Sequence, residues 1–387
     1  MKDIILKNLE ISETMFTNAN DKYLAVAKLL YEKMNGAIVY PQGSFAIGTT
    51  VRPYKGGEDL SYDIDLILVV DRDKASLTGS YLLNEIYEIL SSNDLYKGKL
   101  EKSDKSITIN YADIEGIGFN LDIVPAVIES DEIKKELLEQ GCKYEYVQDA
   151  ISISSLDEKD KNGWYTAIPK AYVSWFEDIN SPYKNYMFEK IKRDKYGKVV
   201  YNSIEEVPHY KIKTPVQEVV QIIKRLRDVH YYKIDEYDKK PISAILTTIV
   251  AKVAFRNKNY EITTFDLLRK VIMELKNYKL CSSLSKDDFQ IRYPGCVDIF
   301  IEDKKWKMIN PVNPKDNLVD SWNKDRKVSF LFFEWLDIIE KELGKLLINS
   351  EDVLTYENLF GSKFISKILG LEFKNNDVEG PKPYGEC

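Results

Sequence analysis

Cysteine and histidine are scarce in this chain. It has four Cys and two His among 387 residues, with no CxxC pair and no HExxH pattern. This composition disfavours a disulfide framework, a zinc ribbon and a histidine-based metal site. Any metal bound by this protein is therefore expected to sit on carboxylate oxygens.

Long hydrophobic runs are also lacking. The longest apolar stretches, such as Ala244–Ala251, fall far short of the roughly 18 residues that a membrane span needs. Acidic residues interrupt the first dozen positions, where a signal peptide needs an apolar core. We therefore expect a cytoplasmic protein that does not contact a membrane.

The balance of charge is acidic. Lys and Arg number 55 and Asp and Glu 62, which gives a net charge of -7. Phosphate backbones repel such a chain, so we expect no extensive nucleic-acid binding. A small anionic substrate is still possible where a pocket is locally basic. With 44% hydrophobic and 30% charged residues, the composition is that of a globular protein.

Hydrophobic spacing divides the chain into two parts. The first part alternates helices and strands: we predict helices over 21–34 and 80–90, and strands over 37–40, 62–70, 106–111 and 118–124. The last two strands should form an antiparallel hairpin. Helical patterns then dominate over 216–231, 242–255, 264–278, 318–346 and 353–371.

This pattern predicts an α+β fold, with a mixed sheet in a first lobe, a mainly helical second lobe and a substrate cleft between them. A polar stretch at 154–163 marks the predicted boundary. We therefore assign residues 1–160 to the first lobe, together with an N-terminal helix, and residues 161–372 to the second. Residues 373–387 are expected to form a flexible tail.

Three aspartates carry the chemical signal. Asp63 and Asp65 lie two apart in a predicted strand, so their carboxylates share one face about 6.6 Å apart. Asp122 lies within another strand between apolar neighbours, where burial without a partner would be costly. Carboxylates on neighbouring strands can hold two Mg²⁺ ions, which align a hydroxyl with a nucleoside triphosphate. A solvated strand edge is the alternative for the first two.

A Gly-Ser pair precedes these strands. Gly43 would let the backbone approach a phosphate closely, and the Ser44 hydroxyl with the amides that follow could hold it. A pair of this kind is usually only a turn. The ordered set of strand, Gly-Ser, helix, paired aspartates, hairpin and third aspartate is much more specific.

On these residues the sequence resembles the nucleotidyltransferases of the polymerase-beta-like superfamily. More narrowly, it resembles the bacterial CD-NTases of CBASS anti-phage systems, which are relatives of cyclic GMP-AMP synthase. The resemblance is carried by QGSFAIGTTVRP, YDIDLILVV and FNLDIVPAV in the first lobe, and in the second by VVQIIKRLRDVHY, KPISAILTT and NPVNPKDNLVDSW. The spacing from Ser44 to Asp63 exceeds that of the minimal motif, and the PYKGGED loop takes up the difference.

The resemblance implies site residues. Asp63 and Asp65 would bind both metal ions, with Mn²⁺ able to replace Mg²⁺, and Asp122 would complete one site and help activate the acceptor hydroxyl. Lys224 and Ser243 would hold the donor triphosphate. An exposed helix charge is the alternative for Lys224, and a helix N-cap is the alternative for Ser243.

The resemblance also implies an activity. The enzyme would join ATP, GTP or other nucleoside triphosphates into a cyclic oligonucleotide, expected to be a cyclic dinucleotide, and release pyrophosphate. Gln42 could touch an acceptor base. Two alternatives stay open: a nucleotidyltransferase with a linear product, acting on RNA ends or on protein, and a noncatalytic nucleotide-binding regulator.

Partners follow from the same resemblance. A separate effector would read the product as a second messenger in anti-phage defence. The C-terminal carboxyl of Cys387 resembles a substrate for a ubiquitin-transfer-like accessory protein, although the tails of relatives usually end in a smaller residue. A plain tail is the alternative.

Overall fold

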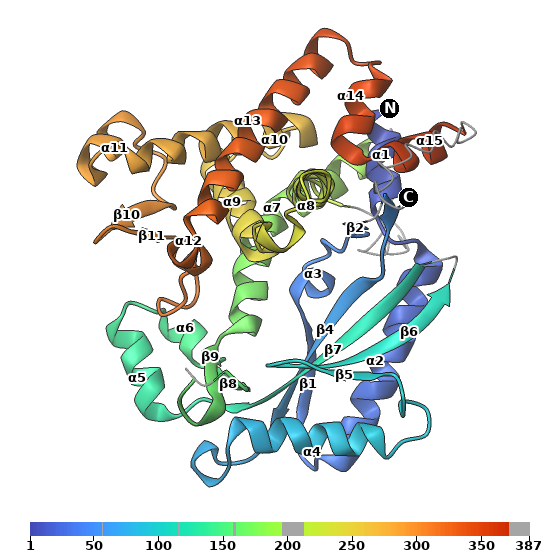
Figure 1. Cartoon of the computed structure of the whole chain (residues 1–387), viewed down its shortest axis with the longest axis vertical. Helices are drawn as coiled ribbons and strands as arrows, with labels where there is room; N and C mark the ends of the chain where they lie inside the picture. Colours follow the sequence, from blue (N-terminus) through green and yellow to red (C-terminus); the bar gives the residue numbers. More distant parts are fainter. Residues whose placement is uncertain (56, 115–116, 158–159, 196–212, 371–387) are drawn as a thin grey trace, which may run out of the picture.

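A sheet forms one half of the molecule and a group of helices forms the other (Figure 1). The computed structural model of the chain describes residues 1–55, 57–114, 117–157, 160–195 and 213–370. The predicted tail at 373–387, including Cys387, lies outside the described residues. Within the described part of the chain, no helix combines the length and apolar character needed to cross a membrane.

The sheet is mixed, as predicted. Its strands are β1 (Ile38–Gln42), β4 (Tyr62–Val70), β5 (Leu100–Lys102), β6 (Ile107–Ile114), β7 (Ile117–Ile128), β8 (Ile151–Ser154) and β9 (Trp164–Ala167). The order is β1-β4-β7-β6-β5, with β8 paired to β7 and β9 to β8. Among the strands that the structure describes, β4 and β7 are the one parallel pair; β6 and β7 form the expected antiparallel hairpin. Because β9 belongs to this sheet, the sheet includes residues beyond 160, where the lobe boundary was predicted from sequence.

Alternation along β4 gives the sheet two different faces. Tyr62, Ile64 and Leu66 point to a core that they share with helices α2 (Glu13–Lys33) and α4 (Gly79–Ser91). The opposite face begins with Asp63 and Asp65, and only further along does the strand supply apolar residues to a small second cluster. Period-two alternation thus sends the acidic side chains away from the main core.

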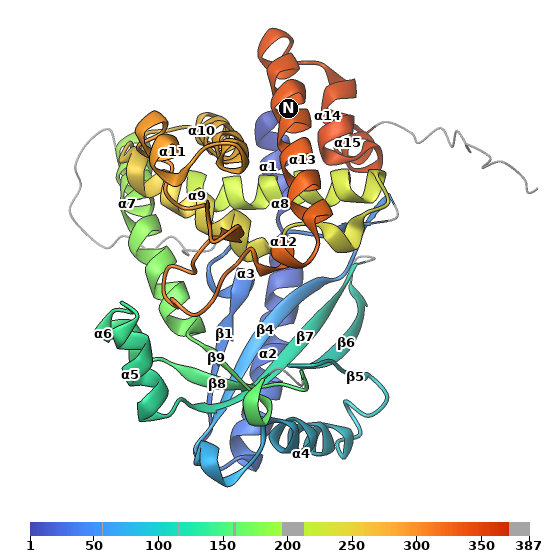
Figure 2. The ribbon, with the colours of Figure 1, turned by 60° about the vertical axis from the view of Figure 1, so that its left-hand side comes forward.

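The second half of the molecule is helical. Its helices are α7 (Pro169–Lys195), α8 (Pro215–Lys233), α9 (Ser243–Asn257), α10 (Thr264–Asn277), α11 (Lys286–Arg292), α12 (Asp320–Lys324), α13 (Arg326–Ile348), α14 (Val353–Phe360) and α15 (Ser362–Leu369). Four short strands lie outside the main sheet: β2 (Tyr54–Lys55), β3 (Glu58–Asp59), β10 (Phe300–Glu302) and β11 (Lys305–Lys307). Two short helices, α5 (Asp131–Glu139) and α6 (Tyr144–Val147), follow β7. Figure 2 shows the sheet and the helical half one above the other.

Helix α8 is the centre of the helical half. It begins with a capping box, in which the Thr214 hydroxyl accepts from the Gln217 amide and the Gln217 side chain accepts from the Thr214 amide. Pro215 occupies the first turn, where its missing N–H costs no hydrogen bond. Most of the side chains that follow are buried. A helix buried on nearly every side places its few charged residues where each one must find a partner.

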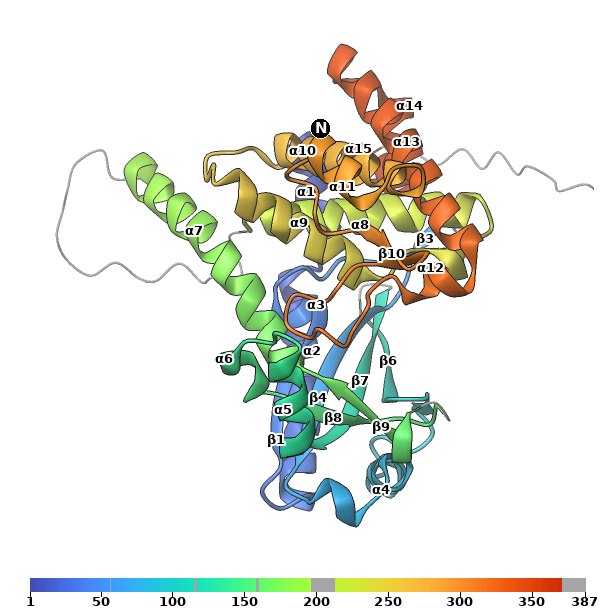
Figure 3. The ribbon, with the colours of Figure 1, turned by 90° about the vertical axis from the view of Figure 1, so that its left-hand side faces the viewer.

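Some boundaries differ from the sequence prediction. Helix α7 reaches Lys195, through a region that looked weakly periodic, and it links the sheet to the helical half (Figure 3). The helix predicted over 353–371 is divided at Gly361, which has a φ of 98°. Helix α1 (Lys2–Leu9) packs its Ile5 and Leu9 into the core of the helical half. No helix was predicted at residues 2–9; the N-terminal helix predicted over 21–34 corresponds to α2, which packs on the sheet.

Candidate active site

The three predicted aspartates lie on adjacent strands. In the parallel pair of β4 and β7, Asp65 is opposite Asp122 and Asp63 is opposite Asn120. On its other side, β4 pairs antiparallel with β1, which sets Gln42 opposite Asp65. The fold thus brings together residues that are separated by up to 80 positions in sequence.

The carboxylates of Asp63 and Asp122 each have a neutral hydrogen-bond partner. The Thr108 hydroxyl of β6 donates to Asp122 at 2.5 Å, and the Asn120 amide donates to Asp63 at 3.1 Å. Asn120 was not predicted, although its position two residues before Asp122 placed it on the same strand face. These donors orient the carboxylates without neutralising their charge.

Burial raises the pKa of all three carboxyl groups. The effect is largest at Asp65, where burial, reinforced by repulsion from Asp122 and Asp63, brings the pKa to about 7. The site therefore concentrates negative charge in a place where solvent screens it poorly. A bound cation would relieve both the desolvation and the repulsion.

The donor set suits a hard divalent ion, but its side chains are not gathered around one point. In the part of the chain that the structure describes, no three His, Cys, Asp or Glu side chains converge as a metal site. Asp63 is engaged with Asn120 and Asp122 with Thr108. Rotation of these two side chains about their own bonds is needed for all three carboxylates to reach a common ion.

Gly43 begins the four-residue helix α3 (Gly43–Ala46) beside the carboxylates, with a φ of 63°. A Cβ placed on Gly43 would overlap the Asp65 carboxylate, at 3.3 Å from its Cγ and closer still to Oδ2. Glycine is therefore required here both by the backbone conformation and by the approach of Asp65. The Ser44 hydroxyl lies 3.5 Å from that of Thr50, which donates to it.

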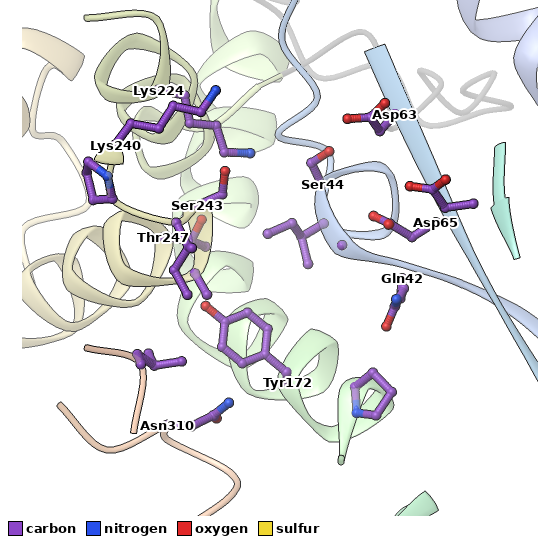
Figure 4. A pocket seen from close by; sticks show the side chains of 18 of the residues that line it. Gln42, Ser44, Asp63, Asp65, Tyr172, Lys224, Lys240, Ser243, Thr247 and Asn310 are labelled. Carbon is purple, nitrogen blue, oxygen red and sulfur yellow. The ribbon is translucent and has the colours of Figure 1, made fainter. Parts of the chain in front are cut away.

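A cavity of about 1220 Å³ lies between the sheet and the helical half. All eight residues predicted for the site line it: Gln42, Gly43, Ser44, Asp63, Asp65, Asp122, Lys224 and Ser243. Figure 4 shows the acids on one wall and the Lys224 and Ser243 side chains on the facing wall. Typical small-molecule sites measure about 300–1,000 Å³, so this cavity is larger than is usual for one small ligand.

Lys224 is not an exposed helix charge. Only 5% of the residue is accessible, and its Nζ donates to the carbonyl oxygen of Thr49 at 3.2 Å. Burial, together with the nearby Arg227 guanidinium, lowers the pKa of Lys224 to about 7, while Asp228 and Asp65 act in the opposite direction. The ammonium group thus connects α8 to the segment that follows Ser44.

Ser243 is not the N-cap of its helix. Ile242 occupies the N-cap position of α9, and Ser243 is the first helical residue. The Ser243 hydroxyl accepts from Nη1 of Arg227 at 3.1 Å. It is exposed on the cavity wall.

A cluster on the cavity wall was missed from sequence. Arg227 donates to Asp228, and the Lys240 Nζ donates to the same Asp228 oxygen at 3.1 Å. The Lys240 ammonium also lies 3.6 Å from the centroid of the Tyr237 ring. Arg227 follows Lys224 by three residues, which places both on one helix face and was a usable signal.

The PYKGGED loop is tied to the helical half by Arg225. Its Nη1 donates to Asp59 at 2.6 Å and its Nε to the carbonyl oxygen of Phe360 at 2.9 Å. The guanidinium also stacks on the rings of Tyr54 and Phe364. The loop therefore joins the two halves of the molecule at the edge of the cavity.

Comparison with known proteins agrees with this geometry. Residues 3–138 match the family model for the Second Messenger Oligonucleotide or Dinucleotide Synthetase domain. A c-di-GMP synthase from Roseivirga ehrenbergii is 25% identical over 363 residues, which cover 91% of this chain and 81% of the relative.

Solved structures share the overall fold. The Bradyrhizobium diazoefficiens CD-NTase CdnG, in complex with GTP, aligns with a TM-score of 0.64 at 17% identity, covering 95% of this chain and 96% of that one. Vibrio cholerae DncV cyclic AMP-GMP synthase, in complex with a linear intermediate, aligns with a TM-score of 0.52 at 14% identity, covering 93% and 94%.

Proposed function

We propose that this chain, a bacterial CD-NTase, joins two nucleoside triphosphates into a cyclic dinucleotide and releases pyrophosphate at each of the two bond-forming steps. The observation that carries this proposal is the cavity, which holds three carboxylates on one wall, faces them with cationic side chains and, at about 1220 Å³, is larger than a typical site for one small ligand. The family match and the c-di-GMP synthase relative support the same reaction.

Magnesium is the proposed cofactor, as two ions, with Mn²⁺ as a substitute. Asp63, Asp65 and Asp122 would hold the ions after the side-chain rotations described above. When bound, Mg²⁺ would neutralise triphosphate charge and favour ionisation of the attacking ribose hydroxyl. The fit rests on the oxygen donors, on their adjacent strands and on the raised pKa values of the carboxyl groups.

The protein side chains would do the remaining work. Deprotonated Asp122, oriented by Thr108, would attract the hydroxyl proton of the acceptor nucleotide. The backbone at Gly43 and the Ser44 hydroxyl would hold the donor triphosphate close to the carboxylates. Gln42, which also lines the cavity, would contact an acceptor base.

The facing wall would bind the rest of the triphosphate. Ser243 presents its hydroxyl to the cavity with Arg227 directly behind it. Lys224 would add charge from its buried position, because an approaching triphosphate favours the protonated ammonium. Its bond to Thr49 would at the same time keep the segment after Ser44 in place.

Incubation with radiolabelled ATP and GTP, followed by phosphatase treatment and mass spectrometry, tests the proposal. A phosphatase-resistant product with the mass of a cyclic dinucleotide is expected. A phosphatase-sensitive product would identify a linear-product enzyme. Absence of pyrophosphate release with Mg²⁺ and with Mn²⁺, using all four nucleotides, would identify a noncatalytic regulator. Asp122→Asn serves as the inactive control.

The cellular role belongs to the same proposal. The product would act as a second messenger in anti-phage defence, and a separate effector would read it. Conjugation of the Cys387 carboxyl by an accessory protein is proposed from the sequence alone. Intact-mass analysis of the protein from cells carrying such an accessory protein would test that modification.

A further inference from the structure

One loop of the helical half supplies part of the cavity wall. It runs over residues 308–321 and is called the asparagine loop here. In Figure 4, Asn310 lies toward the end of the cavity opposite the one that holds Asp63 and Lys224. Because both ends belong to one cavity, a nucleotide whose phosphates lie between the acids and Lys224 has this loop as a candidate surface for its base.

The amides of the asparagine loop are occupied by the protein itself. Asn310 accepts from the Val312 backbone, Asn313 from the Lys315 backbone and Asn317 from the Met308 backbone, at 2.8 to 3.2 Å. Asn313 also donates to the carbonyl oxygen of β9 residue Thr166 at 3.2 Å. The loop is thus braced internally and fixed to the sheet, so its shape is set before a ligand binds.

Asp316 keeps hydrogen-bonding capacity although two donors hold its carboxylate in place. Its Oδ2 accepts from the Asn310 amide at 2.9 Å and its Oδ1 from the Tyr165 hydroxyl at 3.3 Å. An ionised carboxylate has about four acceptor positions. Within the described residues these two donors are the ones that reach Asp316, so two positions stay open on a side chain that lines the cavity.

The open positions fit guanine. The Watson–Crick edge of guanine presents two adjacent donors, the N1–H and one N2–H, and a carboxylate can accept both in a bidentate pair. Adenine presents an acceptor at N1 in the same place, which the carboxylate repels. We propose that Asp316 selects a guanine base on one of the two nucleotides bound in the cavity. This inference rests on the proposed function and specifies its substrate.

Binding affinities of GTP, inosine triphosphate and ATP for the full-length chain test the proposal without requiring turnover. Inosine keeps N1–H but lacks the 2-amino group, so it removes one of the two expected hydrogen bonds. A hydrogen bond to a charged group contributes about 1.5–3 kcal/mol, so inosine triphosphate should bind about tenfold to a hundredfold more weakly than GTP. Equal binding of the two nucleotides would overturn the role of Asp316.

Asp316→Asn tests the residue directly. Its amide offers one acceptor and one donor, so it can no longer accept from both N1–H and N2–H of guanine, whereas it can pair with N1 and the 6-amino group of adenine. We expect the ratio of kcat/KM for GTP to that for ATP to fall at least about tenfold. The gap between GTP and inosine triphosphate in binding should close as well. A ratio unchanged from wild type would overturn the assignment.

Asp320→Asn is the matched control. It makes the same change in charge and shape four residues further on, at the first residue of α12, where the exposed Asp320 carboxylate also lines the cavity but is paired with Lys324 at 2.8 Å. We expect the base preference of this variant to equal that of wild type. An equal shift in both variants would trace the effect to overall charge and refute the assignment. Loss of turnover with nucleotide binding intact would refute the proposed reaction but not base selection.

Discussion

Replacing Gly43 with alanine should separate the conformational requirement at that position from the steric one. The residue has a φ of 63°, where an L-residue with a Cβ costs about 1–2 kcal/mol. Alanine also has less conformational freedom than glycine in the unfolded chain, which stabilises the folded state by about 0.4–1 kcal/mol. The backbone contribution to the free energy of unfolding is therefore a loss of about 1 kcal/mol.

The larger consequence of the Gly43→Ala substitution falls on Asp65. The new Cβ would overlap its carboxylate, so the side chain must leave its present orientation. Moving a side chain off its rotamer costs about 0.5–1.5 kcal/mol, a modest loss of stability. Catalysis should suffer far more: loss of several kcal/mol of transition-state stabilisation corresponds to at least about a hundredfold fall in rate.

Gly98→Ala is the appropriate control for this experiment. Gly98 has a φ of 81°, but a Cβ there would meet no atom within 4 Å. Thermal denaturation of both variants, compared with rates of pyrophosphate release, isolates the effect of displacing Asp65. Activity of Gly43→Ala within about fivefold of Gly98→Ala would refute the reasoning.

Three further outcomes are expected. The double variant Asp63→Asn, Asp65→Asn should lose roughly 99% or more of its activity in the pyrophosphate assay. It should nevertheless melt at an equal or higher temperature without Mg²⁺, because it removes two mutually repelling carboxyl groups whose pKa values are raised in the folded state; a lower melting temperature would contradict this. Lys224→Met should raise the KM for nucleoside triphosphates by about tenfold or more and also raise thermal stability, since burial disfavours the ammonium; an unchanged KM would argue against triphosphate binding. Burial, reinforced by Glu10 and Asp3, raises the pKa of Glu218 to about 7 although its carboxylate accepts from Thr264. The folded state therefore holds the Glu218 proton more tightly than the unfolded state. The free energy of unfolding should fall by up to about 3 kcal/mol as the pH rises from about 4.5 to about 7. Urea denaturation of Glu218→Gln should show a weaker pH dependence in that range; an unchanged dependence would assign it to other groups.

Local pattern was enough to predict β1, β4, β6 and β7 and most of the longer helices, whereas β5, β8, β9 and α7 were not predicted. Alternation around Asp63 and Asp65 identified both the strand and its polar face, because period-two geometry acts within a few residues. Acidic Asp122 among apolar neighbours was informative for the same reason. These features depend on short-range constraints that the sequence displays directly.

What sequence could not supply was the set of contacts between distant segments. Lys224 looked like a candidate surface charge until α8 proved to be buried on nearly all sides. Asp316 gave no local signal, since its environment is built by Tyr165, far away in the chain, and by the bracing of its own loop. Such properties arise only when tertiary packing fixes burial and partners.

The position of α1 bears on how the protein folds as it is synthesised. Ile5 and Leu9 belong to one hydrophobic cluster with residues of α8 and with Ile365 of α15. Helix α1 leaves the ribosome long before those partners, whereas α2 and the sheet strands that follow soon after it can pack on one another. Domains generally fold as units during synthesis, with N-terminal ones first. The sheet half is thus expected to form before α1 finds its partners, so that a helix synthesised ahead of the sheet is among the last elements to reach its final contacts.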